Sequence, residues 1–66
     1  MSNCRLIVDQ LSNNEAADDQ EMIDFLSKET GIEQNTVSKI VQEQRTYFMR
    51  ECLTMVKAEE IISEYL

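Results

Sequence analysis

Carboxylates are the side chains in this sequence best able to do chemistry. The 66 residues include thirteen Asp and Glu, six Lys and Arg and no histidine, which gives a net charge of −7. Paired carboxylates can act as acid and base, but so short a chain offers little wall for the desolvated pocket that shifts a carboxylate pKa. The side chain that usually transfers protons near neutral pH, histidine, is missing. We therefore expect no catalytic residues and no enzyme.

The two cysteines, Cys4 and Cys52, lie far apart and form no CxxC pair. Without histidine to complete a ligand set, a structural zinc site is not expected. The Asp and Asn residues between positions 13 and 19 lack the spacing and the turn glycine of an EF-hand loop. No apolar run approaches the length of a membrane span. The sequence thus predicts no metal, no cofactor and no membrane contact, and its cysteines are expected to be reduced packing residues of a cytoplasmic protein.

A short N-terminal helix is predicted over residues 4–11. Cys4, Ile7, Val8 and Leu11 have the spacing of one helical face. A strand is the competing interpretation, because Ile7 and Val8 are β-branched, but no second strand is evident to pair with it. Residues 12–20 are polar and lack periodic apolar positions, so they are predicted to form a loop.

A second helix is predicted over residues 19–29. Asp18, followed three positions later by Glu21, resembles a capping box at its start. Gly31, the one glycine of the chain, stands where the helix would end in a left-handed residue, and Ile32 is placed to pack back on the helix. The apolar face of this helix consists of Met22, Ile23, Phe25 and Leu26.

Helical spacing continues from residue 34 to residue 66 without glycine or proline. Its apolar positions, the C-terminal stripe, are Val37, Ile40, Val41, Phe48, Cys52, Met55, Ile62 and Leu66, interrupted near the middle by Gln44 or Arg45. Either one long helix projects from the domain, or two helices meet near residues 50–54. A chain this small has few elements to cover the apolar surface, so we predict a homodimer or higher homo-oligomer. The proposed interface, an apolar helix face for a second copy or for a protein partner, comprises Val41, Tyr47, Phe48, Cys52, Met55, Ile62 and Leu66.

Residues 23–41 resemble a helix-turn-helix DNA-binding domain. Leu26, Ser27, Gly31, Ile32, Val37 and Ile40 fall on the spacing that packs two such helices at a steep angle. The same segment is similar to the first two helices of HU-type nucleoid proteins. The resemblance implies that the second helix would face a DNA groove, where Gln and Asn pair with adenine and Lys reaches guanine or phosphate. The implied DNA contacts are Gln34, Asn35, Ser38 and Lys39.

Together these patterns predict an all-α chain with a short N-terminal helix, a helix-turn-helix-like pair and a long or broken C-terminal helix. Residues 1–66 should form a single domain, in which residues 1–17 are the N-terminal helix and polar loop and residues 18–66 the helical core.

The function favoured by this composition is that of a small acidic regulatory protein, which binds an unidentified protein partner and acts as a homo-oligomer. Phage-encoded and mobile-element modulators often have this size and composition. The alternative is a helix-turn-helix transcriptional regulator, although the net charge of −7 opposes binding to DNA phosphates. A third possibility is an acidic nucleic-acid mimic, in which carboxylates between residues 15 and 24 block the basic site of a DNA- or RNA-binding protein.

Overall fold

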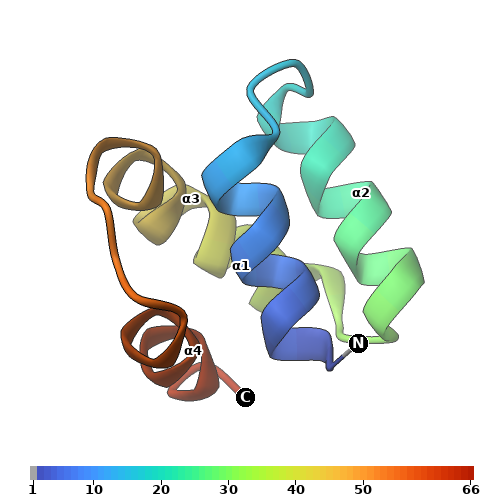
Figure 1. Ribbon diagram of the computed structural model, residues 1–66. Helices are drawn as coiled ribbons and strands as arrows, with labels where there is room; N and C mark the ends of the chain where they lie inside the picture. Colours follow the sequence, from blue (N-terminus) through green and yellow to red (C-terminus); the bar gives the residue numbers. More distant parts are fainter. Residues whose placement is uncertain (1) are drawn as a thin grey trace.

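Four helices make up the computed structural model, which describes residues 2–66. They are α1 (Asn3–Asn13), α2 (Asp19–Thr30), α3 (Gln34–Arg50) and α4 (Met55–Ser63), and this part of the chain has no strand. The predicted all-α class is therefore confirmed. Helix α1 packs against the three other helices, with α2 on one side, α4 on the other and α3 crossing behind (Figure 1). None of the helices within residues 2–66 is long and apolar enough to span a membrane.

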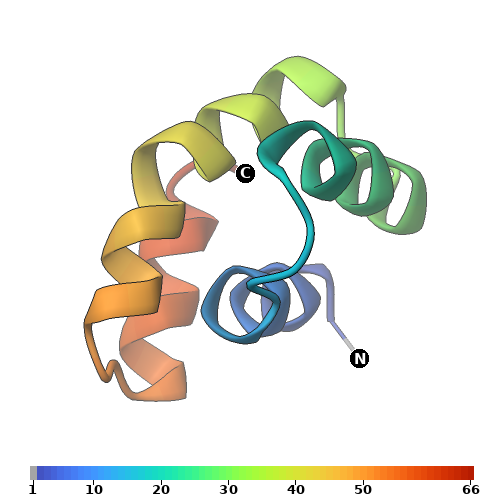
Figure 2. The ribbon, with the colours of Figure 1, turned by 90° about the horizontal axis from the view of Figure 1, so that it is seen from above.

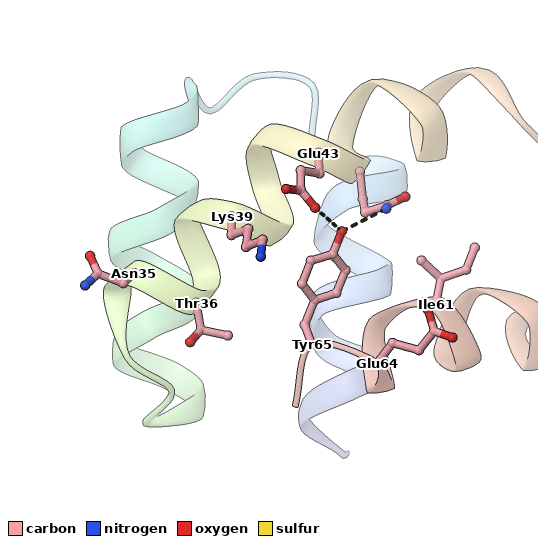
Figure 3. Close-up of a pocket in the computed structure, with 8 residues that line it drawn as sticks. Asn35, Thr36, Lys39, Glu43, Ile61, Glu64 and Tyr65 are labelled. Atoms are coloured by element: carbon pink, nitrogen blue, oxygen red, sulfur yellow. Dashed lines mark hydrogen bonds between the residues drawn. The ribbon is translucent and has the colours of Figure 1, made fainter.

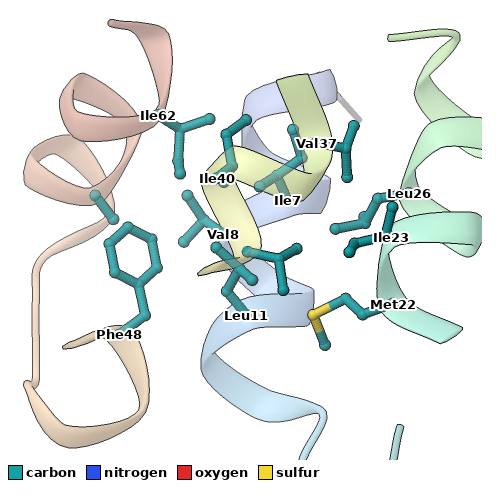
Figure 4. Close-up of a cluster of buried hydrophobic side chains, with 12 residues drawn as sticks. Ile7, Val8, Leu11, Met22, Ile23, Leu26, Val37, Ile40, Phe48 and Ile62 are labelled. Carbon is teal, nitrogen blue, oxygen red and sulfur yellow. The ribbon is translucent and has the colours of Figure 1, made fainter. Parts of the chain in front are cut away.

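Helix α1 confirms the helical interpretation of the N-terminal segment. Ser2 precedes it as N-cap, and its hydroxyl accepts a hydrogen bond from the backbone N–H of Arg5 at 3.2 Å. Ile7, Val8 and Leu11 are almost completely buried, as their shared helical face predicts. Because these side chains lie between those of α2 and α4, α1 belongs to the core and does not merely flank a core of residues 18–66 (Figure 4).

Helix α2 begins and ends where the sequence predicts. The Glu21 backbone N–H donates to an Asp18 carboxylate oxygen at 2.8 Å, and the Glu21 carboxylate accepts from the Asp18 N–H at 3.3 Å, so the capping box is formed. Gly31 closes the helix with a φ of 73°, in the left-handed region, and its N–H donates to the Ser27 carbonyl at 3.0 Å. Ile32 follows as a partly buried residue packed against the core.

The segment after Gln34 is two helices, which decides between the two arrangements left open by the sequence. Helix α3 ends at Arg50, residues 51–54 are non-helical, and α4 begins at Met55. Thr54 is the N-cap of α4, and its hydroxyl accepts from the Lys57 N–H at 3.2 Å. The break lets α4 turn back and pack against α1, and the chain end returns toward the middle of α3, where Tyr65 contacts Glu43 and Gln44 (Figure 2).

All four helices contribute to one hydrophobic core (Figure 4). Its buried members are Ile7, Val8, Leu11, Met22, Ile23, Leu26, Val37, Ile40, Val41, Phe48, Ala58 and Ile62. From α4, Ala58 and Ile62 reach this core, and α4 packs mainly against α1. The packing of all four helices therefore covers most of the C-terminal stripe within a single chain.

This packing changes what the proposed oligomer interface can contain. Val41, Phe48 and Ile62 are at most 3% exposed, so they have no surface to offer a second chain. They belong to the core because the four helices pack on one another, which helical spacing alone does not reveal. The four members that keep exposed surface are Tyr47, Cys52, Met55 and Leu66.

Candidate functional site

A groove lies between α3 and the end of the chain. Its larger part has a volume of about 540 Å³, and its smaller part, of about 350 Å³, shares Thr36 and Tyr65 with it. The larger part is lined by Asn35, Thr36, Lys39, Glu43, Gln44, Ile61, Glu64 and Tyr65 (Figure 3). The smaller part adds Asn3, Ile32, Glu33 and Leu66. We refer to these two parts together as the α3–tail groove.

Tyr65 ties the two walls of the groove together. Its hydroxyl donates to Glu43 Oε1 at 2.6 Å and accepts from Gln44 Nε2 at 2.9 Å (Figure 3). Its backbone N–H donates to the Ile62 carbonyl at 3.0 Å, which extends the last turn beyond α4. The two side-chain bonds fix the aromatic ring against α3, although Tyr65 follows the last helix.

The surroundings of Tyr65 keep its hydroxyl protonated. Partial burial raises the pKa of Tyr65, the hydrogen bond to Glu43 raises it further, and the negative charges of Glu43 and Glu64 act in the same direction. The hydrogen bond from Gln44 opposes these effects. The phenol is therefore a neutral donor that holds the Glu43 carboxylate in a fixed position at the groove wall.

The groove is negatively charged. Glu33, Glu43 and Glu64 line it, against a single ammonium group, that of Lys39. The one ion pair formed within residues 2–66 joins Arg45 to Asp19, so none of these three carboxylates is neutralised by a salt bridge in that part of the chain. All three side chains are exposed, and their charges are available to a binding partner.

The four residues implicated in DNA contact lie on two different rows of α3. Asn35 and Lys39 are exposed and line the α3–tail groove. Gln34 is exposed but donates to an Asp24 carboxylate oxygen of α2 at 3.0 Å. Ser38 is half-buried and accepts from the side-chain amide of Gln42 at 2.9 Å. Positions four apart share a row on a helix, and the row of Gln34 and Ser38 does not line the groove, whereas Asn35 and Lys39 do.

Sequence patterns do not predict the wall of the groove that lies opposite α3. Ile61, Glu64 and Tyr65 lie more than twenty positions from Thr36 along the chain, and the fold-back of α4 brings them together. Nothing in the local pattern pairs Glu43 with Tyr65. A break at Thr54 is the one sequence signal that could have suggested the pairing, because Thr is a favoured N-cap.

Arg45 is a structural anchor on α3. Its guanidinium contacts an Asp19 carboxylate oxygen at 2.7 Å and donates to the Asn14 carbonyl at 3.0 Å and to the Ala17 carbonyl. Its side chain is 14% exposed. Arg45 therefore fixes the connection between α1 and α2 and is not part of the α3–tail groove.

The cysteines and acids of residues 2–66 form no metal site. Within residues 2–66, no group of three or more metal-ligating side chains is close enough to hold an ion. Both cysteines are free thiols; Cys4 is half-buried against the core, as expected of a packing residue, whereas Cys52 is exposed. The expectation of packing therefore fails for Cys52, which follows the end of α3 in the non-helical connection.

The α3–tail groove has the composition of a binding surface. Asn35, Lys39 and Gln44 supply hydrogen-bond donors, Glu43 and Glu64 supply acceptors, and Ile61 and Tyr65 supply apolar area. No family model matches this chain, and neither a curated protein nor a solved structure matches it.

Proposed function

We propose that the chain is a small acidic regulatory protein that binds a protein partner in the α3–tail groove. The observation that carries this proposal is the groove itself. Its larger part has a volume of about 540 Å³ and is lined by polar, charged and apolar side chains. Concave surfaces that combine apolar area with a few placed polar groups are characteristic of binding sites. The proposed partner contact is thus this groove, in place of the apolar interface residues predicted from the sequence.

The groove walls are already held in place, which favours affinity. Tyr65 is fixed by hydrogen bonds to Glu43 and Gln44. Ile61 belongs to α4 and is held in place because the next residue, Ile62, is fully buried. A preorganised surface loses less conformational entropy when a partner binds. A protein segment that enters the groove therefore does not have to assemble it first.

Self-association remains part of the proposal with a smaller interface. The exposed members are Tyr47, Cys52, Met55 and Leu66, of which Leu66 lines the α3–tail groove. The sequence favours a homo-oligomer because of the C-terminal stripe, but most of that stripe is covered within one chain. A homodimer would therefore be joined by exposed side chains at the ends of α3 and α4.

The connection between α2 and α3 favours a second candidate, a helix-turn-helix DNA-binding regulator. Three residues, 31–33, join the two helices, and the left-handed Gly31 permits the sharp turn. Asn35 and Lys39 are exposed on α3, as DNA contacts would need to be. The carboxylates of Asp24 and Glu33 flank the same end of α3 and would repel phosphates, so this candidate is the weaker one.

An acidic nucleic-acid mimic has less support. Asp18 and Glu21 close the N-terminus of α2 through the capping box, and Asp19 pairs with Arg45. Three carboxylates of the acidic segment therefore have roles within the fold. The structural roles of these three acids explain their presence without a nucleic-acid-binding target.

Site-specific photo-crosslinking in the source cells tests the proposal. A benzophenone amino acid replaces Asn35 in the groove, and in a matched control it replaces Glu15, which is exposed in the connection after α1. We expect a protein adduct of one discrete mass from position 35 and none from position 15. A nuclease-sensitive adduct would favour the DNA-binding alternative, and an adduct of twice the chain mass would identify self-association. Equal labelling from both positions, or none from position 35, would contradict the groove as the binding site.

A further inference from the structure

We propose that the α3–tail groove receives a short basic segment of the partner, with a lysine or arginine side chain lying against Tyr65 between Glu43 and Glu64. This inference rests on the proposed function and adds the chemistry of the partner. It is argued from the charge, the fixed geometry and the apolar area of the groove.

Charge complementarity is the first reason. The lining carries the carboxylates of Glu33, Glu43 and Glu64 against the ammonium of Lys39. No salt bridge satisfies these carboxylates in the described part of the chain, residues 2–66. The surrounding surface reinforces the field, since the whole chain has a net charge of −7. Clefts lined by one sign of charge attract and orient partners of the opposite sign.

The second reason is the position of the Glu43 carboxylate. Oε1 is held by the Tyr65 hydroxyl at 2.6 Å, which leaves Oε2 as an acceptor. A carboxylate fixed in this way loses little side-chain entropy when it binds a cation, in contrast to a freely rotating surface glutamate. Glu64 lines the same part of the groove from the opposite wall (Figure 3).

The apolar lining is the third reason. The aromatic ring of Tyr65 and the side chain of Ile61 are half-buried, so part of each faces the groove. Lysine and arginine pack their aliphatic stems on apolar surface and place their charged ends over aromatic rings. Ile32 and Leu66 line the smaller part of the groove, where an apolar neighbour of the basic residue would fit. A segment with both basic and apolar residues therefore matches the lining better than a purely basic one.

Selection from short random peptides displayed on phage tests this inference with the intact chain. We expect the selected peptides to contain lysine or arginine beside an apolar residue. Their synthetic copies should perturb the backbone amide resonances of Asn35, Lys39 and Glu64. Replacing the two acids on either side of the proposed basic side chain, Glu43→Gln and Glu64→Gln, should weaken binding about fivefold, since each partly exposed charge pair contributes modestly. Gln at position 43 keeps an acceptor for the Tyr65 hydroxyl.

The matched control removes the same charge elsewhere. Glu15→Gln with Glu29→Gln neutralises two exposed acids that do not line the groove, and binding should change less than about twofold. Equal weakening by both double variants would show a non-specific charge effect and overturn the inference. Selected peptides that lack basic residues but perturb the groove would overturn it and leave the proposed function standing. Failure to select any peptide would overturn this inference alone, because the cross-link at position 35 decides the proposed function separately.

Discussion

Arg45 accounts for the charged position in the middle of an otherwise apolar helical face. Its guanidinium reaches the Asn14 and Ala17 carbonyls and the Asp19 carboxylate, and within residues 2–66 no buried polar side-chain atom lacks a partner. The sequence shows the interruption of the stripe near residue 45 but not its cause. Two of the acceptors are backbone carbonyls in a loop, and their positions depend on how α1 and α2 pack.

Arg45→Ala should therefore destabilise the fold. It removes three donor contacts and leaves two loop carbonyls without their partner, so we expect the free energy of unfolding to fall by about 1–3 kcal/mol. Arg5→Ala is the control, because Arg5 is exposed and its side chain makes no hydrogen bond in the described structure; its effect should stay within about 0.5 kcal/mol. Urea denaturation measures both values. Equal stability of the two variants would mean that the Arg45 contacts contribute nothing.

Tyr65 gives the stability of the chain an alkaline dependence. Folding raises the pKa of its hydroxyl, so the folded state holds this proton more tightly than the unfolded chain does. The resulting stabilisation is complete below about pH 10, the ordinary pKa of tyrosine, and is lost as the pH rises through the folded-state pKa. Above about pH 10, we therefore expect the free energy of unfolding to fall more steeply with pH for the native chain than for Tyr65→Phe. Parallel curves for the two proteins would contradict this prediction.

At the scale of the helices, sequence patterns predict the elements whose ends carry their own signals. Asp18 with Glu21 opens α2, and the left-handed Gly31 closes it, as predicted. Beyond Gln34, helical spacing continues across the break, so the spacing alone could not separate α3 from α4. The break depends on the Thr54 cap and on the burial of Ile62 against α1, a contact between distant segments.

The same contact limits how much of the candidate site is visible in the sequence. Asn35 and Lys39 follow from the helical pattern as exposed residues of α3, and both line the groove. Glu64 and Tyr65 face them because of the fold-back. Half of the groove therefore depends on tertiary packing, which local spacing does not encode.

Helix α4 should be the element most easily released from the fold. Ala58 and Ile62 are the only buried residues of α4, so Ile62→Ala removes much of the apolar contact that holds α4 to the core. We expect a loss of about 2–5 kcal/mol, with amide hydrogen exchange accelerated more in α4 than in α2. Val56→Ala is the control on the same helix, because Val56 is 70% exposed and should cost little. Uniform acceleration across all helices would instead show that α4 unfolds together with the rest.

At the scale of the whole molecule, a single chain is as compact as a folded chain of its length. Its radius of gyration is 10.4 Å, close to the value of about 11 Å expected for a folded chain of this length. Its extents of 25, 23 and 20 Å are similar in all directions, so no helix projects. The single-chain core removes the main reason for expecting an oligomer, although exposed apolar side chains remain.

Light scattering over a range of concentrations tests self-association. If the exposed residues Tyr47, Met55 and Leu66 join two copies, the mass should be twice the 7.7 kDa of one chain, and Tyr47→Asp with Met55→Asp should restore the single-chain mass. Val37 and Ile40 are buried and unaffected by these changes, so the variant should remain folded. A mass of 7.7 kDa for the native chain at every concentration would contradict the homodimer.

Asn3 and Leu66 line the same part of the groove, so the two ends of the described chain are neighbours. A short flexible linker could therefore join them, and the circle could be reopened in the exposed, non-helical connection at Cys52. In this circular permutant, α4 would precede α1 directly and would be held to it through the linker. The order of the helices along the chain would change while every packing contact described here stayed possible.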